Sequence, residues 1–196
     1  MVCGQDIPGS KGAIGRYPPD AFVYTLGCHI GPAVQMVSTA EGYCEAVEDE
    51  WIARAGWPAA ADALFDISVF AGSSQGGFFR PILESNAFSV SREQLRRLGG
   101  YDERFTSPGG GLANLEMFSR YVMAPHAVNV CLLTDMTFHQ THGGIATSGK
   151  AKWEDFHAEY VSIFGRAYAP PEYATLYLGP IRGAARRFAA RSLELI

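Results

Sequence analysis

Short apolar runs alternate with amphipathic segments along this chain. Four runs rich in apolar and β-branched residues predict strands. Three of them cover residues 21–26, 64–70 and 127–133, and the fourth lies within residues 78–90 and ends near Ser89. Apolar positions at helical spacing predict helices between these strands and after the last one. Strands that alternate with helices indicate an α/β domain with a mixed, largely parallel sheet flanked by helices.

Helix-capping patterns set the expected bounds of two helices. Ser38 with Glu41 has the spacing of a capping box, and the helix that it opens is expected to end near Gly56. Ser91 with Gln94 has the same spacing and opens a short second helix. Further helices are expected from residue 112 onward and over residues 153–164. The acidic residues on the outer face of the first helix, expected to be solvated, are Glu45, Glu48, Asp49 and Glu50.

Composition narrows the classes of protein that the chain can belong to. The 196 residues suit one ordinary domain, and the formal net charge of −4 argues against a nucleic-acid partner. No segment has the pattern of a signal peptide or of a membrane span, so a cytoplasmic protein is expected. No CxxC pair is present, so free thiols of a reducing compartment are expected at Cys3, Cys28, Cys44 and Cys131.

The chain divides into three expected parts. Residues 1–20 have the composition of an irregular arm, residues 21–165 form the α/β domain, and residues 166–196 form a C-terminal extension. The extension contains a candidate amphipathic helix, which is expected to dock on the surface of the domain or, as an alternative, to contact an anionic membrane face or a partner. Its basic residues are Arg182, Arg186, Arg187 and Arg191.

Two histidines follow the strand at residues 127–133 in the order His-x-x-His-Gly-Gly. Neutral imidazoles are good ligands for Mn²⁺ or Zn²⁺, and the spacing of His139 and His142 favours one metal ligand and one hydrogen-bond donor over two ligands. Histidines that pack or cap a turn are the alternative. His29 and His126 have no partner at ligand spacing and are expected to be structural or surface residues. His157 lies one helical turn beyond Trp153 and is expected to pack there.

Polar residues also surround the glycine-rich loop. Asn114 and Glu116 lie just inside the helix after Gly109, Gly110 and Gly111, where free N–H groups favour anions. A carboxylate there could act as a general base, or it could only stabilise the first helical turn.

Three more polar residues precede that loop. Asp102 follows a Gly-Gly-Tyr sequence and is expected to order a turn. Glu84 and Asn86 lie in the predicted strand that ends near Ser89, and alternation puts both on one face. A sugar, with its many hydroxyl groups, would be a suitable partner for two polar groups on a buried face.

The stretch ESNAFSVSREQLRRLGGYDERF, with GGGLANLEMFSR after it, resembles the corresponding part of family-2-type inverting glycosyltransferases with the GT-A fold. The Asn-x-Glu of the second stretch, and GGFF at residues 76–79, also resemble motifs of polypeptide N-acetylgalactosaminyl transferases. The resemblance covers residues 64–145. It implies a GT-A-like mixed sheet and transfer of a sugar from a nucleotide-sugar donor to a hydroxyl acceptor, such as a glycan, with inversion.

The resemblance also implies roles for particular residues. A divalent cation, Mn²⁺ or Mg²⁺, would be held with the help of His139. Glu116, or less favourably Asp102, would be the general base. The residues that would contact sugar or phosphate are Glu84, Asn86, Gly109, Gly110, Gly111, Asn114 and His142.

The chain departs from the family pattern at three points. Ala113 and Asn114 stand where the family usually has Glu and Asp, and no Asp-x-Asp is present. The N-terminal nucleotide-binding half is therefore expected to be supplied elsewhere, as an upstream segment or a separate polypeptide. Two alternatives remain: a non-catalytic carbohydrate-binding or pairing module, and a metal-dependent hydrolase that uses both histidines and a third ligand.

Overall fold

The computed structural model describes residue 18, residues 20–147 and residues 152–196. The predicted arm at residues 1–20 lies almost wholly outside these ranges, as does Cys3. The strands are β1 (Ala21–Ile30), β2 (Ser68–Phe70), β3 (Phe88–Ser89), β4 (Val128–His139) and β5 (Leu176–Leu178). The α-helices are α2 (Gln35–Ala40), α3 (Glu45–Ala55), α4 (Arg92–Leu98), α5 (Ala113–Val122), α6 (Trp153–Phe164) and α7 (Arg186–Leu193). The short 3₁₀ turns are η1 (Ala61–Phe65), η2 (Gly72–Ser74), η3 (Pro108–Gly110) and η4 (Gly183–Ala185).

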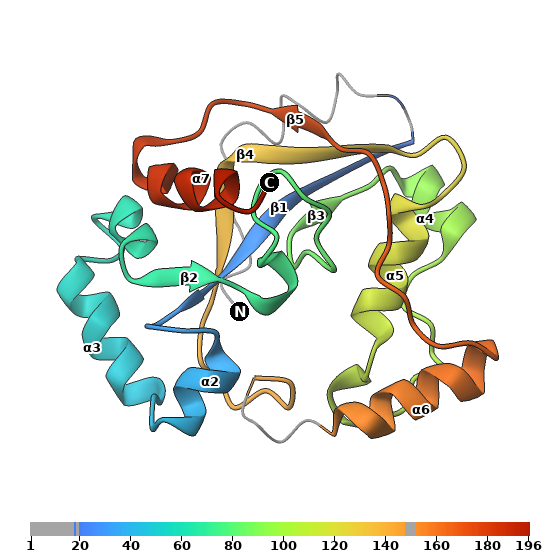
Figure 1. Cartoon of the computed structure of the whole chain (residues 1–196), viewed down its shortest axis with the longest axis horizontal. Helices are drawn as coiled ribbons and strands as arrows, with labels where there is room; N and C mark the ends of the chain where they lie inside the picture. Colours follow the sequence, from blue (N-terminus) through green and yellow to red (C-terminus); the bar gives the residue numbers. More distant parts are fainter. Residues whose placement is uncertain (1–17, 19, 148–151) are drawn as a thin grey trace.

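The strands form one mixed sheet in the order β2-β1-β4-β5, with β3 also paired to β1. The longest pairing is parallel and joins β1 to β4, and β4 pairs with β5 in parallel as well. The pairings of β1 with β2 and with β3 are short and antiparallel. This arrangement confirms the expected α/β class with a mostly parallel sheet flanked by helices. Figure 1 shows α2 and α3 on one side of the molecule and α4, α5 and α6 on the other.

Strand β1 is buried along almost its whole length, as expected for a strand in the interior of the sheet that pairs in parallel with β4. Its residues Phe22, Tyr24, Leu26 and Cys28 alternate along the strand and join the main core. The ring of Phe22 meets Phe118 of α5 edge-on, with ring centroids 5.5 Å apart. Intervening residues of β1 join a second cluster with β4, which contains Ala21, Val23, Val130 and Leu132.

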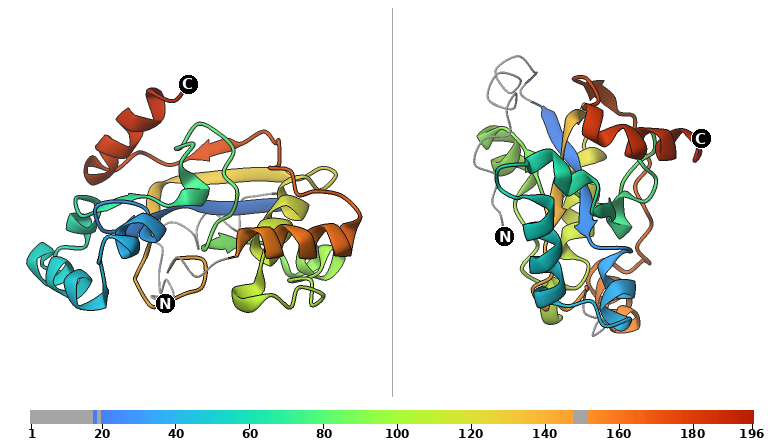
Figure 2. Two further views of the ribbon diagram at one scale, coloured as in Figure 1. Left: turned by 60° about the horizontal axis from the view of Figure 1, so that its bottom comes forward. Right: turned by 90° about the vertical axis from the view of Figure 1, so that its left-hand side faces the viewer.

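The C-terminal helix α7 docks on the body of the protein. Ser192 is fully buried, and its hydroxyl oxygen accepts a hydrogen bond from the Phe78 backbone N–H at 3.0 Å. Phe188, also buried, meets the ring of Phe70 at a centroid distance of 4.9 Å. Both views of Figure 2 show α7 well separated from α6.

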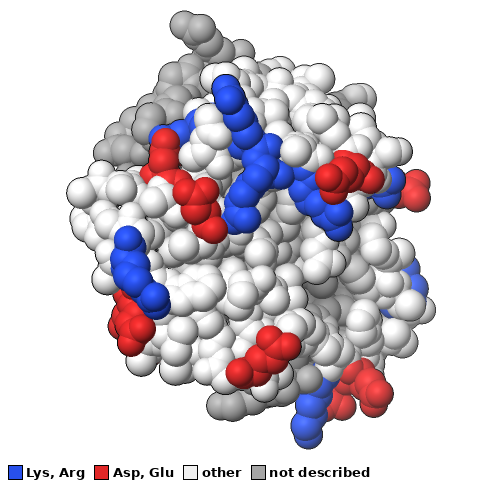
Figure 3. All heavy atoms as spheres, turned by 60° about the vertical axis from the view of Figure 1, so that its left-hand side comes forward, with Lys and Arg blue, Asp and Glu red and all other residues white. Residues whose placement is uncertain are grey.

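Three arginines of the C-terminal extension bind atoms of their own chain. Arg182 forms ion pairs with Asp62 and Asp135. Arg187 donates to the backbone carbonyls of Phe65 and Ser68. Arg191 pairs with Glu194. Figure 3 shows basic side chains next to acidic ones on this face. These contacts are those of a helix that docks on the surface of the domain, and contact with a membrane face or a partner stays a prediction. Among the described residues, no helix is both long and apolar enough to cross a bilayer.

The helix predicted from Ser38 to Gly56 is wrong in two respects. Residues 35–55 form two helices, α2 and α3, separated at Gly42, whose φ is +94°. Ser38 does not cap a helix, because it lies inside α2 and its hydroxyl donates to the Ala33 carbonyl. The expectation that Glu48 is solvated is also wrong, since this side chain is 2 % exposed. By contrast, the Ser91 cap is confirmed, because its hydroxyl accepts the Gln94 N–H at 3.0 Å.

The predicted strands are only partly confirmed. The run at residues 64–70 begins as a 3₁₀ turn and is a strand only from Ser68, and the run at 78–90 is a strand only at Phe88–Ser89. The expectation that Glu84 and Asn86 share a strand face is therefore wrong, because both precede β3. Strand β4 extends six residues beyond the predicted end, to His139, and β5 was not predicted. The described cysteines, Cys28, Cys44 and Cys131, are free, as expected.

Replacement of Gly77 with alanine is expected to destabilise the protein by about 2–3 kcal/mol, because Gly77 has φ +74° and an added Cβ would lie 2.4 Å from the Ser192 hydroxyl. Urea unfolding measures the effect. Gly183→Ala is the control, since a Cβ there meets nothing within 4 Å, and its unfolding free energy is expected to change by less than about 0.5 kcal/mol. Equal effects of the two substitutions would contradict the docking of α7 against Gly77.

Candidate functional site

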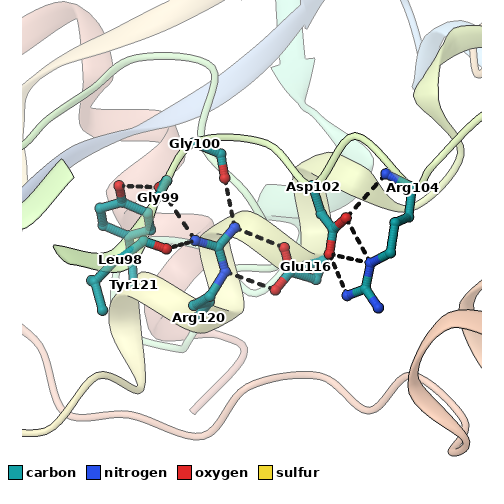
Figure 4. Close-up of polar contacts among 8 residues, drawn as sticks. All are labelled: Leu98, Gly99, Gly100, Asp102, Arg104, Glu116, Arg120 and Tyr121. Carbon is teal, nitrogen blue, oxygen red and sulfur yellow. Dashed lines mark hydrogen bonds and ion pairs between the residues drawn. The ribbon is translucent and has the colours of Figure 1, made fainter. Parts of the chain in front are cut away.

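Glu116 lies in the first turn of α5 and forms an ion pair with Arg120, which lies one turn later. The Arg120 Nε donates to Oε1 of Glu116 at 2.8 Å and its terminal nitrogen donates to Oε2 at 2.9 Å. The same guanidinium donates to the backbone carbonyls of Leu98, Gly99 and Gly100 at the end of α4 (Figure 4). The Glu116 carboxylate therefore helps Arg120 to bind α5 to α4, and both of its oxygens are engaged.

Asp102 is also engaged by an arginine. Arg104 donates to both carboxylate oxygens of Asp102, with the shortest contact at 2.6 Å, and the Arg104 backbone N–H donates to Oδ1 at 3.0 Å. These hydrogen bonds lower the pKa of Asp102 to about 2. A carboxylate with so low a pKa is a weak base, and the contact to the Arg104 backbone matches the turn-ordering role expected from the sequence.

Glu84 differs from these two carboxylates because no ion pair forms to it within the described part of the chain. Burial raises its pKa, and a hydrogen bond from the Asn114 side chain offsets part of that rise. Asn114 itself is exposed at the start of α5, as is Asn86 two residues after Glu84. The structure therefore brings together Glu84 and Asn114, which are 30 positions apart in the sequence.

A small cavity lies next to these residues. Its lining includes Ser85, Asn86, Tyr101 and Asn114, and its volume is about 10 Å³. This volume holds at most one water-sized group, so a sugar would have to bind at the open surface. A larger groove of about 650 Å³ lies between β2, α7 and the segment before α2, and none of the predicted site residues lines it.

The glycine-rich loop has the backbone conformation that its sequence suggests. Gly109, Gly110 and Gly111 have φ values of +76°, +84° and +52°, which residues with a side chain rarely adopt. Glu159 of α6 holds the residues before the loop, because its Oε1 accepts the backbone N–H groups of Thr106 and Ser107.

His139 and His142 lie side by side at the carboxyl end of β4. Their Nε2 atoms are 3.2 Å apart and their ring centroids 4.9 Å apart. His139 is partly buried and His142 is exposed. Burial, together with the neighbouring His142, lowers the pKa of His139, so its neutral form is favoured.

Gln35 at the start of α2 forms hydrogen bonds with two histidines, His139 and His29. Its side-chain oxygen lies 2.8 Å from Nδ1 of His139, and its side-chain nitrogen donates to the His139 carbonyl at 2.9 Å. Its backbone N–H donates to Nδ1 of His29 at 2.9 Å. Burial and the nearby His139 lower the pKa of His29 to about 4, so His29 is a neutral acceptor, in keeping with its predicted structural role.

Glu48 of α3 fixes the backbone between the two histidines. One carboxylate oxygen accepts the Thr141 backbone N–H at 2.8 Å, and the other accepts the Thr141 hydroxyl at 3.0 Å. Burial raises the pKa of Glu48, and the hydrogen bonds from Thr141 offset part of the rise. The histidine loop, residues 140–147, is thereby attached to α3.

The histidine loop also reaches the glycine-rich loop. Gly109 lies so close to Ile145 that an added Cβ would be 3.1 Å from the Ile145 Cβ. On the other side, the Thr39 hydroxyl of α2 donates to the Thr147 carbonyl at 3.0 Å. The loop therefore connects the helices near β2 to the start of α5, where Asn114 and Glu84 lie.

The histidines are the groups best suited to a metal ion. Within residues 20–147 and 152–196, no group of three or more His, Cys, Asp or Glu side chains is placed to hold one. The chain matches no family model, no curated protein and no solved structure. The family resemblance of the motifs therefore stays a prediction from the sequence.

Two residues of the site were missed in the sequence. Glu48 lies in an acidic run, and nothing local distinguishes it from its solvated neighbours. Gln35 lies outside the predicted helix. A weak signal existed for Gln35, because it follows His29 closely after a buried strand, in a segment rich in Gly and Pro.

Glu116→Ala is expected to lower the free energy of unfolding by about 2 kcal/mol, because Arg120 then loses its carboxylate while it remains mostly buried. The matched control is Glu50→Ala, which removes an ion pair of the same spacing whose side chains are 74 % and 70 % exposed. There we expect less than about 0.5 kcal/mol. Urea unfolding compares the two, and a control as damaging as Glu116→Ala would rule out a special role for the Glu116 pair.

The carboxyl group of Glu84 is expected to titrate above the usual glutamate range in a ¹³C NMR pH series. Because its pKa is raised in the folded state, folding stability present at low pH is lost as the pH rises through that value. Glu84→Gln cannot ionise, so its unfolding free energy relative to the unmodified protein should rise as the pH increases above about 4.3, where a glutamate of the unfolded chain ionises. The exposed Glu103, replaced in the same way, serves as the control. A stability difference independent of pH would refute the raised pKa.

Proposed function

We propose that this chain is the acceptor-side, metal-binding portion of a family-2-like inverting glycosyltransferase. The observation that carries the proposal is the pair of imidazole nitrogens 3.2 Å apart at the carboxyl end of a parallel strand. In open α/β sheets, ligands bind at the carboxyl ends of strands. Two contacts support a single extended site: Ile145 of the histidine loop lies against Gly109, and Asn114 of the helix after the glycine-rich loop is hydrogen-bonded to Glu84.

In the proposed reaction, an acceptor hydroxyl attacks the anomeric carbon of a nucleotide-sugar. The new bond joins the acceptor oxygen to that carbon, the bond from the carbon to the phosphate oxygen breaks, and a nucleoside diphosphate leaves. The acceptor proton passes to a carboxylate. We assign this base role to Glu84 rather than to Glu116 or Asp102, because both of these are chelated by arginines.

The other predicted residues take supporting roles in the proposal. Asn114 and Asn86, both exposed, would bind sugar hydroxyls, and the glycine-rich loop directly precedes the helix that carries Asn114. A divalent cation, Mn²⁺ or Mg²⁺, would supply charge neutralisation of the leaving diphosphate, and His139 would help to hold it. The donor nucleotide would be held by a nucleotide-binding half that is encoded upstream or as a separate polypeptide.

A non-catalytic carbohydrate-binding module is the second candidate. One observation favours it: the two carboxylates that the sequence motifs suggest as the base, Glu116 and Asp102, are held in ion pairs. Such a module would bind glycans without releasing a nucleoside diphosphate.

Release of nucleoside diphosphate is the test of the proposed function. The chain is produced together with the polypeptide encoded directly upstream and mixed with Mn²⁺, a panel of UDP-, GDP- and dTDP-sugars and a panel of monosaccharide acceptors. We expect acceptor-dependent release, reduced more than about a hundredfold by Glu84→Gln, because general-base catalysis contributes about that much. Glu103→Gln is the control. Binding of glycans without release from any donor would instead establish the second candidate.

A further inference from the structure

We propose that His139 and His142 together chelate one divalent transition-metal ion through their Nε2 atoms. Gln35 is the positioning residue that keeps the His139 ring in the tautomer that this binding requires. The inference rests on the proposed function only for the role of the ion in sugar transfer. Binding of the ion is a separate property and is tested without any donor or acceptor.

The orientation of the Gln35 amide is fixed by its partners. Its nitrogen lies 2.9 Å from the His139 carbonyl oxygen and 3.3 Å from the Thr141 hydroxyl. A reversed amide would put two acceptor oxygens against each other without a proton between them. The oxygen of the amide is therefore the atom that faces Nδ1 of His139 at 2.8 Å.

This orientation determines the protonation of the His139 ring. Because the amide oxygen can only accept, Nδ1 of His139 must donate and carries the proton. In the neutral imidazole, Nε2 then holds a free lone pair, and this atom faces Nε2 of His142. Metal-bound histidines commonly donate their other ring N–H to an oxygen in this way.

The spacing of the two rings suits a chelate. Two nitrogens bonded to one ion at about 2.1 Å, with an angle between about 90° and 109°, are about 3.0–3.4 Å apart. The observed separation of 3.2 Å falls within this range, and the ring centroids are 4.9 Å apart. The same separation fits an N–H···N hydrogen bond from His142 to His139 in the metal-free chain, so the ion would replace the proton on Nε2 of His142. His142 is exposed, which leaves the remaining coordination positions open to water or to oxygens of a ligand.

Two imidazoles also favour particular metals. Imidazole suits Zn²⁺, Ni²⁺ and related ions, whereas Mg²⁺ prefers oxygen ligands and gives up its water reluctantly. The site is therefore expected to bind Zn²⁺ in preference to Mg²⁺. The backbone of the pair is restrained, because His139 is the last residue of strand β4 and Glu48 holds Thr141, which lies between the two histidines.

The tautomers are measured first, by long-range ¹H–¹⁵N NMR of the ¹⁵N-labelled chain without metal. We expect His139 to carry its proton on Nδ1. On addition of Zn²⁺ to one equivalent, the Nε2 signals of His139 and His142 are expected to shift together. A proton on Nε2 of His139 in the metal-free chain would overturn the role of Gln35, and a proton retained on Nε2 of His142 at saturating Zn²⁺ would overturn the chelate.

Calorimetric titration with ZnCl₂ then compares variants whose folding is checked by circular dichroism. His139→Ala and His142→Ala are each expected to weaken Zn²⁺ binding more than tenfold, and Gln35→Met about ten- to a hundredfold. The exposed His157→Ala is the matched control and should bind as tightly as the unmodified chain. If Gln35→Met does not fold, the tautomer measurement on the unmodified chain decides its role.

The outcomes separate this inference from the proposed function. Unchanged Zn²⁺ affinity in His142→Ala would overturn the chelate, even if sugar transfer is found. Zn²⁺ binding that needs both histidines, in a chain that releases no nucleoside diphosphate with any partner, would support the chelate and refute transfer. An excess of MgCl₂ is expected to leave bound Zn²⁺ in place, and full displacement would contradict the preference for imidazole-binding ions.

Discussion

The parallel pairing of β1 with β4 is the constraint on which the rest of the molecule depends. It runs from Ala21 beside Val128 to His29 beside His139, with an irregularity that opposes Tyr24 and Leu26 to Cys131 and Met136. That irregularity adds residues to β4 only, so its second half is realigned with β1. The two strands therefore end together, and the residues that follow them, the start of α2 and the histidine loop, meet at one edge of the sheet.

The sequence predicted the parts of the fold that depend on local chemistry. The Ser91 cap and the helices expected from residue 112 onward and over residues 153–164 are set by neighbouring residues, and each is found where it was expected. The strands were harder, because β3 is two residues long and β4 continues through Thr134 and Asp135, which interrupt the apolar pattern. Pairing of Met136–His139 with β1, and not the local pattern, makes the end of β4 a strand.

The residues of the candidate site could be predicted from the sequence, but the side chains that contact them could not. The histidines, Asn114 and Glu84 carried recognisable signals. The arginines that engage Asp102 and Glu116 were in view in the sequence, but a helical i, i+4 pair does not reveal whether it faces solvent or the protein. Gln35 and Glu48 contact residues more than 90 positions away, so only the tertiary fold identifies them.

The close approach of Ile145 to Gly109 has a consequence for the direction from which a ligand can arrive. The two loops touch, so they cannot separate to admit a molecule between them without breaking that contact. The exposed polar groups, at His142, Asn114 and Asn86, instead lie open to solvent. Exposed groups of this kind suit the end of a long chain better than a free metabolite, because a small molecule is bound tightly when a pocket buries most of its surface.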